Sequence, residues 1–334
     1  MNTKESYIGV FDSGVGGISV LRHLVRLLPE EKFLYLGDSA NAPYGTKTRQ
    51  QVAKLSFAVA EKLLARDIKA LVVACNTATS AAINDLRQAY PDLIVVGIEP
   101  ALKLAADKFP GGNLGVMATP MTLREEKFAA LLQRFSDTNT IHKLPAPGLV
   151  ELVEAGKADS AEAEALLTEL LGEYAGKLDA LVLGCTHYPF AAKAITRVLG
   201  EKTVLLDGGE GTARETKRRL AEAGLLRNGK GEVRIENSAG DEKLYQEVLA
   251  EYCKQEKEYA GKLQQYFDEQ NWKEFRIIVH AIKGASLLVG ANQFSEWAKE
   301  IELSIKEGDD TIAKADGEAF IETYRRLVEK LENN

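Results

Sequence analysis

Residues 69–79 read Lys-Ala-Leu-Val-Val-Ala-Cys-Asn-Thr-Ala-Thr, and residues 179–189 read Asp-Ala-Leu-Val-Leu-Gly-Cys-Thr-His-Tyr-Pro. Each stretch begins with an apolar run typical of a buried β-strand, and each run ends at a cysteine followed by polar residues. The two cysteines, Cys75 and Cys185, lie 110 residues apart. The similarity of their surroundings predicts that the chain contains the same structural unit twice.

A second pair of matching runs supports this duplication. Residues 8–13 read Ile-Gly-Val-Phe-Asp-Ser and residues 114–119 read Leu-Gly-Val-Met-Ala-Thr, at a similar offset of 106 residues. Two related halves with one thiol each predict a pseudo-symmetric cleft with a cysteine on either wall. Two opposed bases can take a proton from one face of a carbon atom and return one to the other face.

From residue 8 to about 235 the sequence alternates between short apolar runs and amphipathic stretches of helical length. Continuous apolar strands separated by helices are typical of parallel sheets covered on both faces, so we predict an α/β fold. Ligands bind such sheets at the carboxyl ends of the strands, where Asp12, Cys75 and Cys185 fall. The runs that we predict as strands are Tyr7–Phe11, Phe33–Leu36, Ala70–Val73, Ile94–Ile98, Leu114–Met117, Ala180–Leu183 and Val204–Leu206.

The character of the sequence changes after Gly240. Residues 241–334 contain 20 acidic and 13 basic side chains, whereas the preceding residues contain 29 of each, so the net charge of −7 belongs entirely to the tail. Proline is absent from the tail and its periodicity is helical. We predict an all-α antiparallel helix bundle, with helices at about 241–270, 272–288, 292–307 and 315–332.

Composition and charge exclude several classes of protein. Neither part of the chain has the basic surface that nucleic acid requires, and no apolar run approaches the roughly 20 residues of a membrane helix. The polar start predicts no secretory leader, and three cysteines are too few for a disulfide framework. Because no histidine and cysteine pair has the spacing of a metal site, we predict no metal. Together these features predict a cytoplasmic globular protein without nucleic-acid or membrane partners.

The cysteines have two interpretations. A lone cysteine at a strand end is often only a small buried hydrophobe, but the repeated context of Cys75 and Cys185 favours a catalytic pair. A thiol with a pKa of about 8.5 must be kept partly ionised if it is to act as a base. Asp12 and His187 are candidate neighbours that could hold the proton.

Three other stretches have patterns that are less specific. Residues 11–17, Phe-Asp-Ser-Gly-Val-Gly-Gly, are a poor match to the glycine-rich loop of dinucleotide-binding proteins, and the helix start that follows suits a carboxylate better. In residues 149–154, Leu-Val-Glu-Leu-Val-Glu, the pattern fits Glu151 and Glu154 equally well as candidate acids. Residues 42–45, Ala-Pro-Tyr-Gly, have the composition of a turn.

Five motifs nevertheless occur in an order that resembles the signature of the glutamate racemases, a cofactor-independent family. They are Phe-Asp-Ser-Gly-Val-Gly-Gly, Pro-Tyr-Gly, Ala-Cys-Asn-Thr-Ala-Thr, Leu-Val-Glu-Ala-Gly and Gly-Cys-Thr-His-Tyr-Pro. The resemblance covers residues 7 to about 237. It implies two pseudo-symmetric domains with the site in the cleft between them, the first formed by 1–97 and 207–237 and the second by 98–206. It also implies conversion of L-glutamate to D-glutamate for peptidoglycan synthesis.

The resemblance further assigns roles to individual residues. It implies that Cys75 and Cys185 are the acid/base thiols and that Asp12 assists Cys75. It selects Glu154 over Glu151 and implies that Glu154 and His187 assist Cys185. The residues that it implies in binding the substrate's ammonium and carboxylate groups are Asp12, Ser13, Pro43, Tyr44, Gly45, Asn76, Thr77, Thr119, Thr122 and Thr186.

The tail contains the sequence Val-His-Ala-Ile-Lys-Gly-Ala-Ser at 279–286. At roughly 100° per residue, His280, Lys283 and Gly284 fall on the solvent side with Arg276. The opposite stripe, which faces the bundle, comprises Phe275, Ile278, Val279, Ile282, Ser286 and Val289. The segment 241–334 resembles a histidine phosphotransfer (HPt) domain, which implies that His280 is phosphorylated by a response-regulator receiver domain. The competing interpretation is a bundle used only for assembly.

We therefore predict a glutamate racemase fused to an HPt-like tail, and we keep two alternatives. A racemase of another amino acid in the same superfamily would differ only in the size of its pocket. A signalling protein whose α/β part merely senses glutamate would not need both thiols. For the assembly state, a homodimer is kept as a hypothesis.

Overall fold

The computed structural model of the chain describes residues 3–98, 101–238, 240, 259–288 and 291–332. Its internal contacts divide the chain into two compact units. The first unit comprises Met1–Leu24, Lys32–Arg227 and Arg234–Asp241, and the second comprises Val25–Glu31, Asn228–Val233 and Glu242–Asn334.

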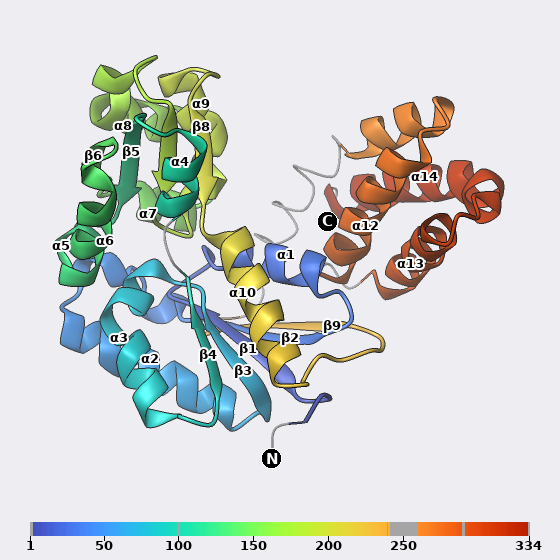
Figure 1. Ribbon diagram of the computed structural model, residues 1–334, viewed down its shortest axis with the longest axis horizontal. Helices are drawn as coiled ribbons and strands as arrows, with labels where there is room; N and C mark the ends of the chain where they lie inside the picture. The colour runs from blue at the N-terminus through green and yellow to red at the C-terminus, as the bar shows by residue number, and fades with distance from the viewer. Residues whose placement is uncertain (1–2, 99–100, 239, 241–258, 289–290, 333–334) are drawn as a thin grey trace. The chain divides into compact units, whose positions relative to one another are not determined.

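The first unit contains two separate sheets (Figure 1). The larger has the strand order β4-β3-β1-β2-β9, and β1 to β4 pair in parallel. The central strand β3 (Ile68–Val73) is buried at every residue, which is why it reads as a continuous apolar run. The bounds of the other strands are β1 (Tyr7–Asp12), β2 (Lys32–Gly37), β4 (Ile94–Gly97) and β9 (Glu232–Asn237).

The second sheet repeats this arrangement on a smaller scale. Its strand order is β6-β5-β7-β8, all parallel, with β5 (Asn113–Ala118) and β7 (Ala180–Leu183) at the centre. The edge strands are β6 (Thr140–Pro145) and β8 (Val204–Asp207). In each sheet the strand before a cysteine pairs directly with the strand that begins the corresponding half, so the predicted duplication is confirmed at the level of topology.

The predicted α/β class is confirmed, and all seven predicted strands are present. The sequence analysis was wrong in omitting β6 and β9. Both are edge strands, and most of their residues are half-buried or exposed, so neither gives the continuous apolar run of a central strand.

Helices lie between the strands of this unit, and α2 and α3 pack against each other and against the first sheet. One buried cluster between these elements includes Val59, Leu63, Leu86 and Phe11. The helix bounds are α1 (Ile18–Leu27), α2 (Arg49–Leu64), α3 (Asn76–Ala89), α4 (Leu102–Lys108), α5 (Pro120–Arg124), α6 (Glu126–Ser136), α7 (Leu149–Glu154), α8 (Ala161–Leu171), α9 (Ala192–Leu199) and α10 (Gly209–Glu222).

The tail is helical, as predicted. Residues 259–268 are helical and are followed by α12 (Trp272–Leu288), α13 (Asn292–Lys306) and α14 (Thr311–Glu332). Their buried side chains form one core, in which the rings of Phe294 and Phe320 stack with centroids 4.6 Å apart. The last helix begins at Thr311, four residues before the predicted start, and the part of the first predicted helix at 241–258 lies outside the described residues.

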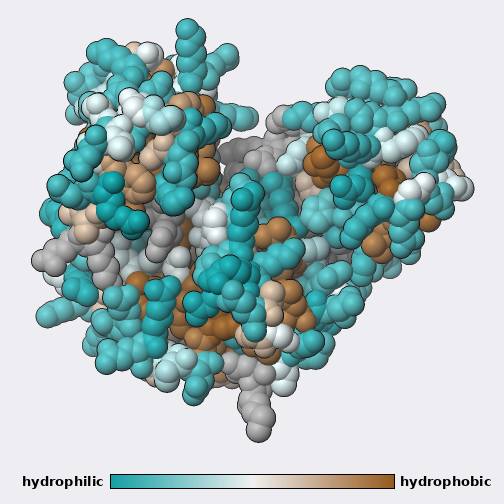
Figure 2. Space-filling model, in the orientation of Figure 1, coloured by the Kyte–Doolittle hydropathy of each residue, from teal (hydrophilic) through white to brown (hydrophobic). Residues whose placement is uncertain are grey.

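Hydrophilic residues cover most of the visible surface of α12 to α14 in Figure 2. Among the described residues of the bundle, Ile277, Leu303 and Ile312 are large hydrophobic side chains that are exposed. Single exposed hydrophobic residues are normal on a globular protein and need no partner to explain them.

We expect a truncated protein of residues 1–238 to fold, because it contains every strand of both sheets. Ser238 also stays in place, where its N–H donates to the Gly37 carbonyl and its Oγ accepts from the N–H of Ala40. Far-ultraviolet circular dichroism with thermal unfolding tests this expectation, and a single cooperative transition is the expected result. An insoluble or unfolded fragment would show that the tail completes the α/β fold and would contradict the domain boundary predicted near residue 240.

Candidate active site

The candidate catalytic residues lie at the carboxyl ends of the strands. Asp12 is the last residue of β1, Cys75 follows β3, and Cys185 follows β7. Thr119 follows β5 and caps the N-terminus of α5. Within each sheet the parallel strands end at one edge. The hydrogen bond of Thr186 to Asp12 and the contact of Thr77 with Thr119 join the edge of one sheet to the edge of the other.

Cys75 is buried and caps the N-terminus of α3. Its Sγ accepts a hydrogen bond from the N–H of Ala78 at 3.4 Å and lies 3.6 Å from the Oγ of Ser13. Burial raises the pKa of the Cys75 thiol well above its usual value, and the charge of Asp12 adds to this effect, while the Ala78 and Ser13 contacts oppose it. The resting group is therefore a thiol, and its conjugate thiolate is a strong base.

Asp12 is completely buried and connects the two halves of the unit. Its Oδ1 accepts a hydrogen bond from the N–H of Gly14, and its Oδ2 accepts one from the Oγ1 of Thr186, both at 2.9 Å. Burial raises the pKa of Asp12, although the nearby His187 and the two hydrogen bonds act in the opposite direction. This carboxyl group thus keeps a proton at higher pH than an ordinary aspartate.

Cys185, His187 and Glu154 form a chain of contacts. The Sγ of Cys185 lies 3.7 Å from Nδ1 of His187, and Nε2 of His187 lies 2.7 Å from Oε1 of Glu154. Burial of His187 disfavours its charged form, yet the hydrogen bonds to Cys185 and Glu154 prevail and raise the pKa of His187 well above its usual value. A protonated imidazole at this position can donate a proton to the sulfur.

The structure distinguishes the two glutamates that the pattern of α7 left open. Glu154 contacts His187, and its Oε1 also accepts a hydrogen bond from the N–H of Val15 at 2.9 Å. Glu151 is exposed on the same helix. The geometry therefore favours Glu154 as the carboxylate of this group.

The glycines of residues 11–17 have a packing reason. A Cβ atom on Gly14 would overlap the Glu154 carboxylate, and one on Gly16 would overlap the ring of His187. The hydroxyl of Tyr35, a residue that the sequence analysis did not single out, donates to the carbonyl of Gly14 at 2.6 Å. The glycines thus allow the close approach of Glu154 and His187, which explains them without a dinucleotide.

Small polar side chains of α3 and α5 meet beside Cys75. The hydroxyl of Thr77 lies 3.3 Å from those of Thr119 and Thr122, and the latter two are 2.9 Å apart. Asn76 is also buried, and its Oδ1 has no hydrogen-bond partner among the residues that the structure describes. A buried acceptor of this kind suits a donor group on a bound molecule.

The turn that contains Pro43, Tyr44 and Gly45 is held by Asp38, which directly follows β2. The buried hydroxyl of Tyr44 donates to Oδ2 of Asp38 at 2.7 Å. A Cβ atom on Gly45 would lie 2.9 Å from that of Thr119, so the turn approaches the threonine group closely. Pro43 is half-buried at the start of the turn, and its carbonyl accepts from the hydroxyl of Thr46.

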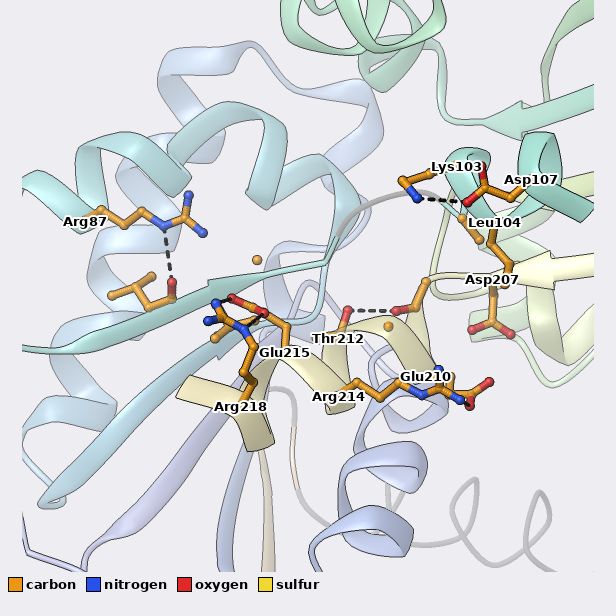
Figure 3. A pocket seen from close by; sticks show the side chains of 16 residues that line it. Arg87, Lys103, Leu104, Asp107, Asp207, Glu210, Thr212, Arg214, Glu215 and Arg218 are labelled. Carbon is orange, nitrogen blue, oxygen red and sulfur yellow. Dashed lines mark hydrogen bonds and ion pairs between the residues drawn. The ribbon is translucent and has the colours of Figure 1, made fainter. Parts of the chain in front are cut away.

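A cavity of about 770 Å³ lies away from these residues, lined by parts of α4, β4 and α10 (Figure 3). Arg218 pairs with Glu215, and Lys103 pairs with Asp107, on its walls. The candidate catalytic residues do not line this cavity. Most of its charged side chains form ion pairs with one another, and we assign it no ligand.

Among the residues that the structure describes, no group of three or more histidine, cysteine, aspartate or glutamate side chains could hold a metal ion. No helix in the described part of the chain has the length and apolar character needed to cross a membrane.

The second unit contains the other candidate, His280 on α12. The predicted apolar stripe of this helix is confirmed for Phe275, Ile278, Val279, Ile282 and Ser286, which are all buried. Val289 lies outside the described residues.

The predicted position of Lys283 in solvent is wrong. The side chain is only 9% exposed, because its Nζ reaches Oε2 of Glu302 on α13 at 2.7 Å. His280 is 37% exposed, and its Nδ1 lies 2.8 Å from Oε1 of the same carboxylate. A helical wheel describes one helix only and does not show what the neighbouring helix places over it.

Comparison with known proteins agrees with both units. The Asp/Glu/hydantoin racemase family matches residues 8–216, and the Hpt domain family matches residues 247–334. The glutamate racemase of Clostridium kluyveri is 50% identical over 258 residues, which cover 75% of this chain and 100% of that protein. The glutamate racemase of Clostridium acetobutylicum is 49% identical over 247 residues, which cover 73% of this chain and 96% of that protein.

Solved structures give the same result. Glutamate racemase isoform RacE1 from Bacillus anthracis has a TM-score of 0.66 and 32% identity, over 72% of this chain and 92% of that one. Glutamate racemase from Thermus thermophilus, in complex with β-chloro-D-alanine, has a TM-score of 0.63 and 40% identity, over 73% of this chain and 91% of that one. The chain therefore belongs to the Asp/Glu/hydantoin racemase family, among its glutamate racemases, and carries a C-terminal Hpt domain.

Proposed function

We propose that this glutamate racemase works without a cofactor, by a two-base mechanism in which Cys75 and Cys185 act on opposite faces of the α-carbon. The observations that carry the proposal are the corresponding places of the two thiols in the two halves and the contact of Cys185 with His187, which in turn contacts Glu154. We propose Asp12, buried at the end of β1, as the group that assists Cys75. In either direction one thiolate removes the α-proton while the opposite thiol protonates the other face.

The carbanion that forms between the thiols needs stabilisation, because a carbon acid is far weaker than any side chain. The N-terminus of α3, which Cys75 caps, presents N–H groups and a positive helix-dipole end to the site. We infer that Asn76 accepts from the substrate ammonium group. We infer that Ser13 and the hydroxyls of Thr77, Thr119 and Thr122 donate to the carboxylates. Thr186 and the turn at Pro43, Tyr44 and Gly45 complete the proposed substrate site.

The assay that tests this function follows the circular dichroism of L-glutamate with purified protein and no added cofactor. We expect the signal to decay to zero as the two enantiomers equalise. Decay with aspartate and not with glutamate would identify a racemase of another amino acid, and no decay with any amino acid would identify a sensor. A requirement for an added cofactor after dialysis would contradict the two-thiol mechanism.

D-Glutamate made in this way would supply peptidoglycan synthesis. Both described cysteines are free thiols, and their proposed role requires them to stay reduced, so we place the enzyme in the cytoplasm. A homodimer remains a hypothesis, which light scattering during size-exclusion chromatography tests against the chain mass of 36.5 kDa.

We propose for the tail that His280 accepts a phosphoryl group from the aspartyl phosphate of a receiver domain. The Hpt match and the partial exposure of His280 support this function. Incubation with radiolabelled phospho-receiver domains is expected to label the wild-type chain and not the His280→Ala variant. Equal label in both, or none in either across the receiver set of the cell, would leave the tail as an assembly module. Racemase assays with the phosphorylated chain then test whether the tail regulates D-glutamate supply.

Replacement of Asp38 by asparagine should weaken substrate binding more than turnover. The Tyr44 hydroxyl would lose a charge-assisted hydrogen bond worth roughly 1.5–3 kcal/mol, and the turn beside Thr119 would be less well held. We expect KM for glutamate to rise about tenfold with a smaller change in kcat. The exposed Asp137→Asn variant is the matched control. An unchanged KM in Asp38→Asn would show that this turn does not contribute to binding.

A further inference from the structure

The hydroxyl of Tyr35 holds the short loop that precedes α1. Tyr35 lies on β2 and is completely buried. Its hydroxyl donates to the carbonyl oxygen of Gly14 at 2.6 Å and accepts a hydrogen bond from the N–H of Gly17. A Cβ atom on Gly17 would lie 2.8 Å from the hydroxyl oxygen, so this close approach requires a glycine. The hydroxyl thus connects the two ends of residues 14–17.

The peptide group that Tyr35 holds carries a donor on its opposite side. The carbonyl of Gly14 and the N–H of Val15 belong to one planar trans peptide, in which the two groups point in opposite directions. The N–H of Val15 donates to Oε1 of Glu154 at 2.9 Å, across 139 residues of sequence. A donor that fixes the carbonyl therefore also fixes the direction of the N–H that the Glu154 carboxylate accepts.

The Glu154 carboxylate leads from this peptide to the second thiol. Its Oε1, which accepts from Val15, also lies 2.7 Å from Nε2 of His187, and Nδ1 of His187 lies 3.7 Å from Sγ of Cys185. Burial raises the pKa of Tyr35 well above its usual value, so the hydroxyl keeps its proton and remains a donor. Hydrogen bonds in series polarise one another, so donation to the carbonyl also strengthens the N–H of the same peptide as a donor.

We propose that Tyr35 is a positioning residue for racemisation, which acts on Cys185 through the Gly14–Val15 peptide, Glu154 and His187. The inference rests on the two-base mechanism proposed above. Both hydrogen bonds of the Tyr35 hydroxyl are to main-chain groups, so this role requires no contact with the substrate. The hydroxyl keeps the Glu154 carboxylate in the place from which it stabilises the protonated form of His187.

The first experiment removes only the hydroxyl, by Tyr35→Phe in the full-length enzyme. We expect kcat to fall about tenfold, as for the loss of one hydrogen bond, while KM for glutamate stays nearly unchanged. The titratable groups that act on His187 include Cys185, Glu154 and Asp12. Because Glu154 would then raise the pKa of His187 less, the alkaline limb of the kcat/KM profile should move to lower pH.

Tyr324→Phe is the matched control for this variant. Tyr324 is a completely buried tyrosine of α14, and its hydroxyl has no hydrogen-bond partner among the residues that the structure describes. The same chemical change is therefore made at a residue to which we assign no role, and we expect it to keep the wild-type kcat and pH profile. An alkaline limb that does not move in Tyr35→Phe would overturn the inference.

The second experiment is a double-mutant cycle, which distinguishes a role through Glu154 from a general loss of packing. Tyr35→Phe is made in the Glu154→Gln background, where the carboxylate charge is already absent. If Tyr35 acts through that carboxylate, the second change should leave kcat and the pH profile of Glu154→Gln nearly unchanged. An equal loss of kcat in both backgrounds would show that the two residues act independently and would contradict the proposal.

The cycle also separates this inference from the two-base mechanism. Large losses of kcat in Cys185→Ser and in Glu154→Gln, together with an independent effect of Tyr35→Phe, would refute the role of Tyr35 and leave the mechanism standing. Near wild-type kcat in both Cys185→Ser and Glu154→Gln would refute the mechanism and the role of Tyr35 with it.

Thermal unfolding of each variant accompanies the rates. If Tyr35→Phe does not fold, 3-fluorotyrosine incorporated at position 35 keeps the ring and makes its hydroxyl a stronger donor. We then expect the alkaline limb of the kcat/KM profile to move to higher pH in the otherwise wild-type enzyme and not in the Glu154→Gln background. A limb that moves in both backgrounds, or in neither, would overturn the inference.

Discussion

Replacement of Cys75 or Cys185 by serine is expected to lower kcat for glutamate racemisation about 10³-fold in either direction. A serine hydroxyl fills nearly the same space, but it is a much weaker acid than a thiol and cannot ionise to serve as the base. Each half of the reaction needs one thiolate and one thiol, so loss of either group stops the full cycle. Polarimetric rates from L-glutamate and from D-glutamate measure the effect.

The third cysteine supplies the matched control. Cys253 belongs to the tail segment outside the described residues, and Cys253→Ser makes the same chemical change at a cysteine to which we assign no role. We expect it to keep the wild-type rate. Near wild-type activity in Cys75→Ser or in Cys185→Ser would show that racemisation does not depend on that thiol and would refute the two-base account.

Neutralisation of Glu154 is expected to be the next largest effect, with kcat lowered roughly 10²-fold in Glu154→Gln. The carboxylate contacts His187 at 2.7 Å and helps to raise the pKa of that histidine well above its usual value. Without the negative charge the imidazolium form is less stable, so the pKa of His187 falls. We therefore expect the alkaline limb of the kcat/KM profile to move to lower pH.

Glu151→Gln is the control for this variant, because Glu151 lies on the same helix and is exposed. It makes the same change of charge, and we expect neither kcat nor the pH profile to move. A pH profile of Glu154→Gln identical to that of the wild type would mean that the Glu154–His187 contact does not control proton transfer at Cys185.

Central strands were predictable from the sequence, and edge strands were not. Runs such as Ala70–Val73 and Ala180–Leu183 are buried on both faces, so they consist of consecutive apolar residues. β6 contains His142 and Lys143 and pairs on one side only, so its sequence is not a continuous apolar run. β9 is similarly polar and is the edge strand next to β2, which lies far from it along the chain.

Some residues of the candidate site could be predicted from the sequence, and others only from contacts between distant parts of the chain. Asp12 and Cys75 could be found because strand ends in one parallel sheet converge, and Cys185 because its surroundings repeat those of Cys75. The preference for Glu154 over Glu151 depends on a contact with His187, 33 residues away, which no pattern within α7 contains.

The role of Asp38 and the burial of Lys283 depend on tertiary contacts in the same way. Asp38 acts through the hydroxyl of Tyr44, and Lys283 is covered by Glu302 of the neighbouring helix. Sequence periodicity gives the face of a helix on which a side chain lies, but it does not give the partner that the fold brings to that face.

The most direct test of the two-base mechanism is the fate of the α-hydrogen in D₂O. Protiated L-glutamate is incubated with the full-length enzyme, and the hydrogen isotope at the α-carbon of both enantiomers is measured at low conversion. Opposed thiols predict that newly formed D-glutamate carries deuterium while the remaining L-glutamate keeps protium, because the proton removed and the proton added belong to different groups. Protium retained in the D-glutamate, or deuterium entering the L-glutamate as fast as product forms, would contradict it.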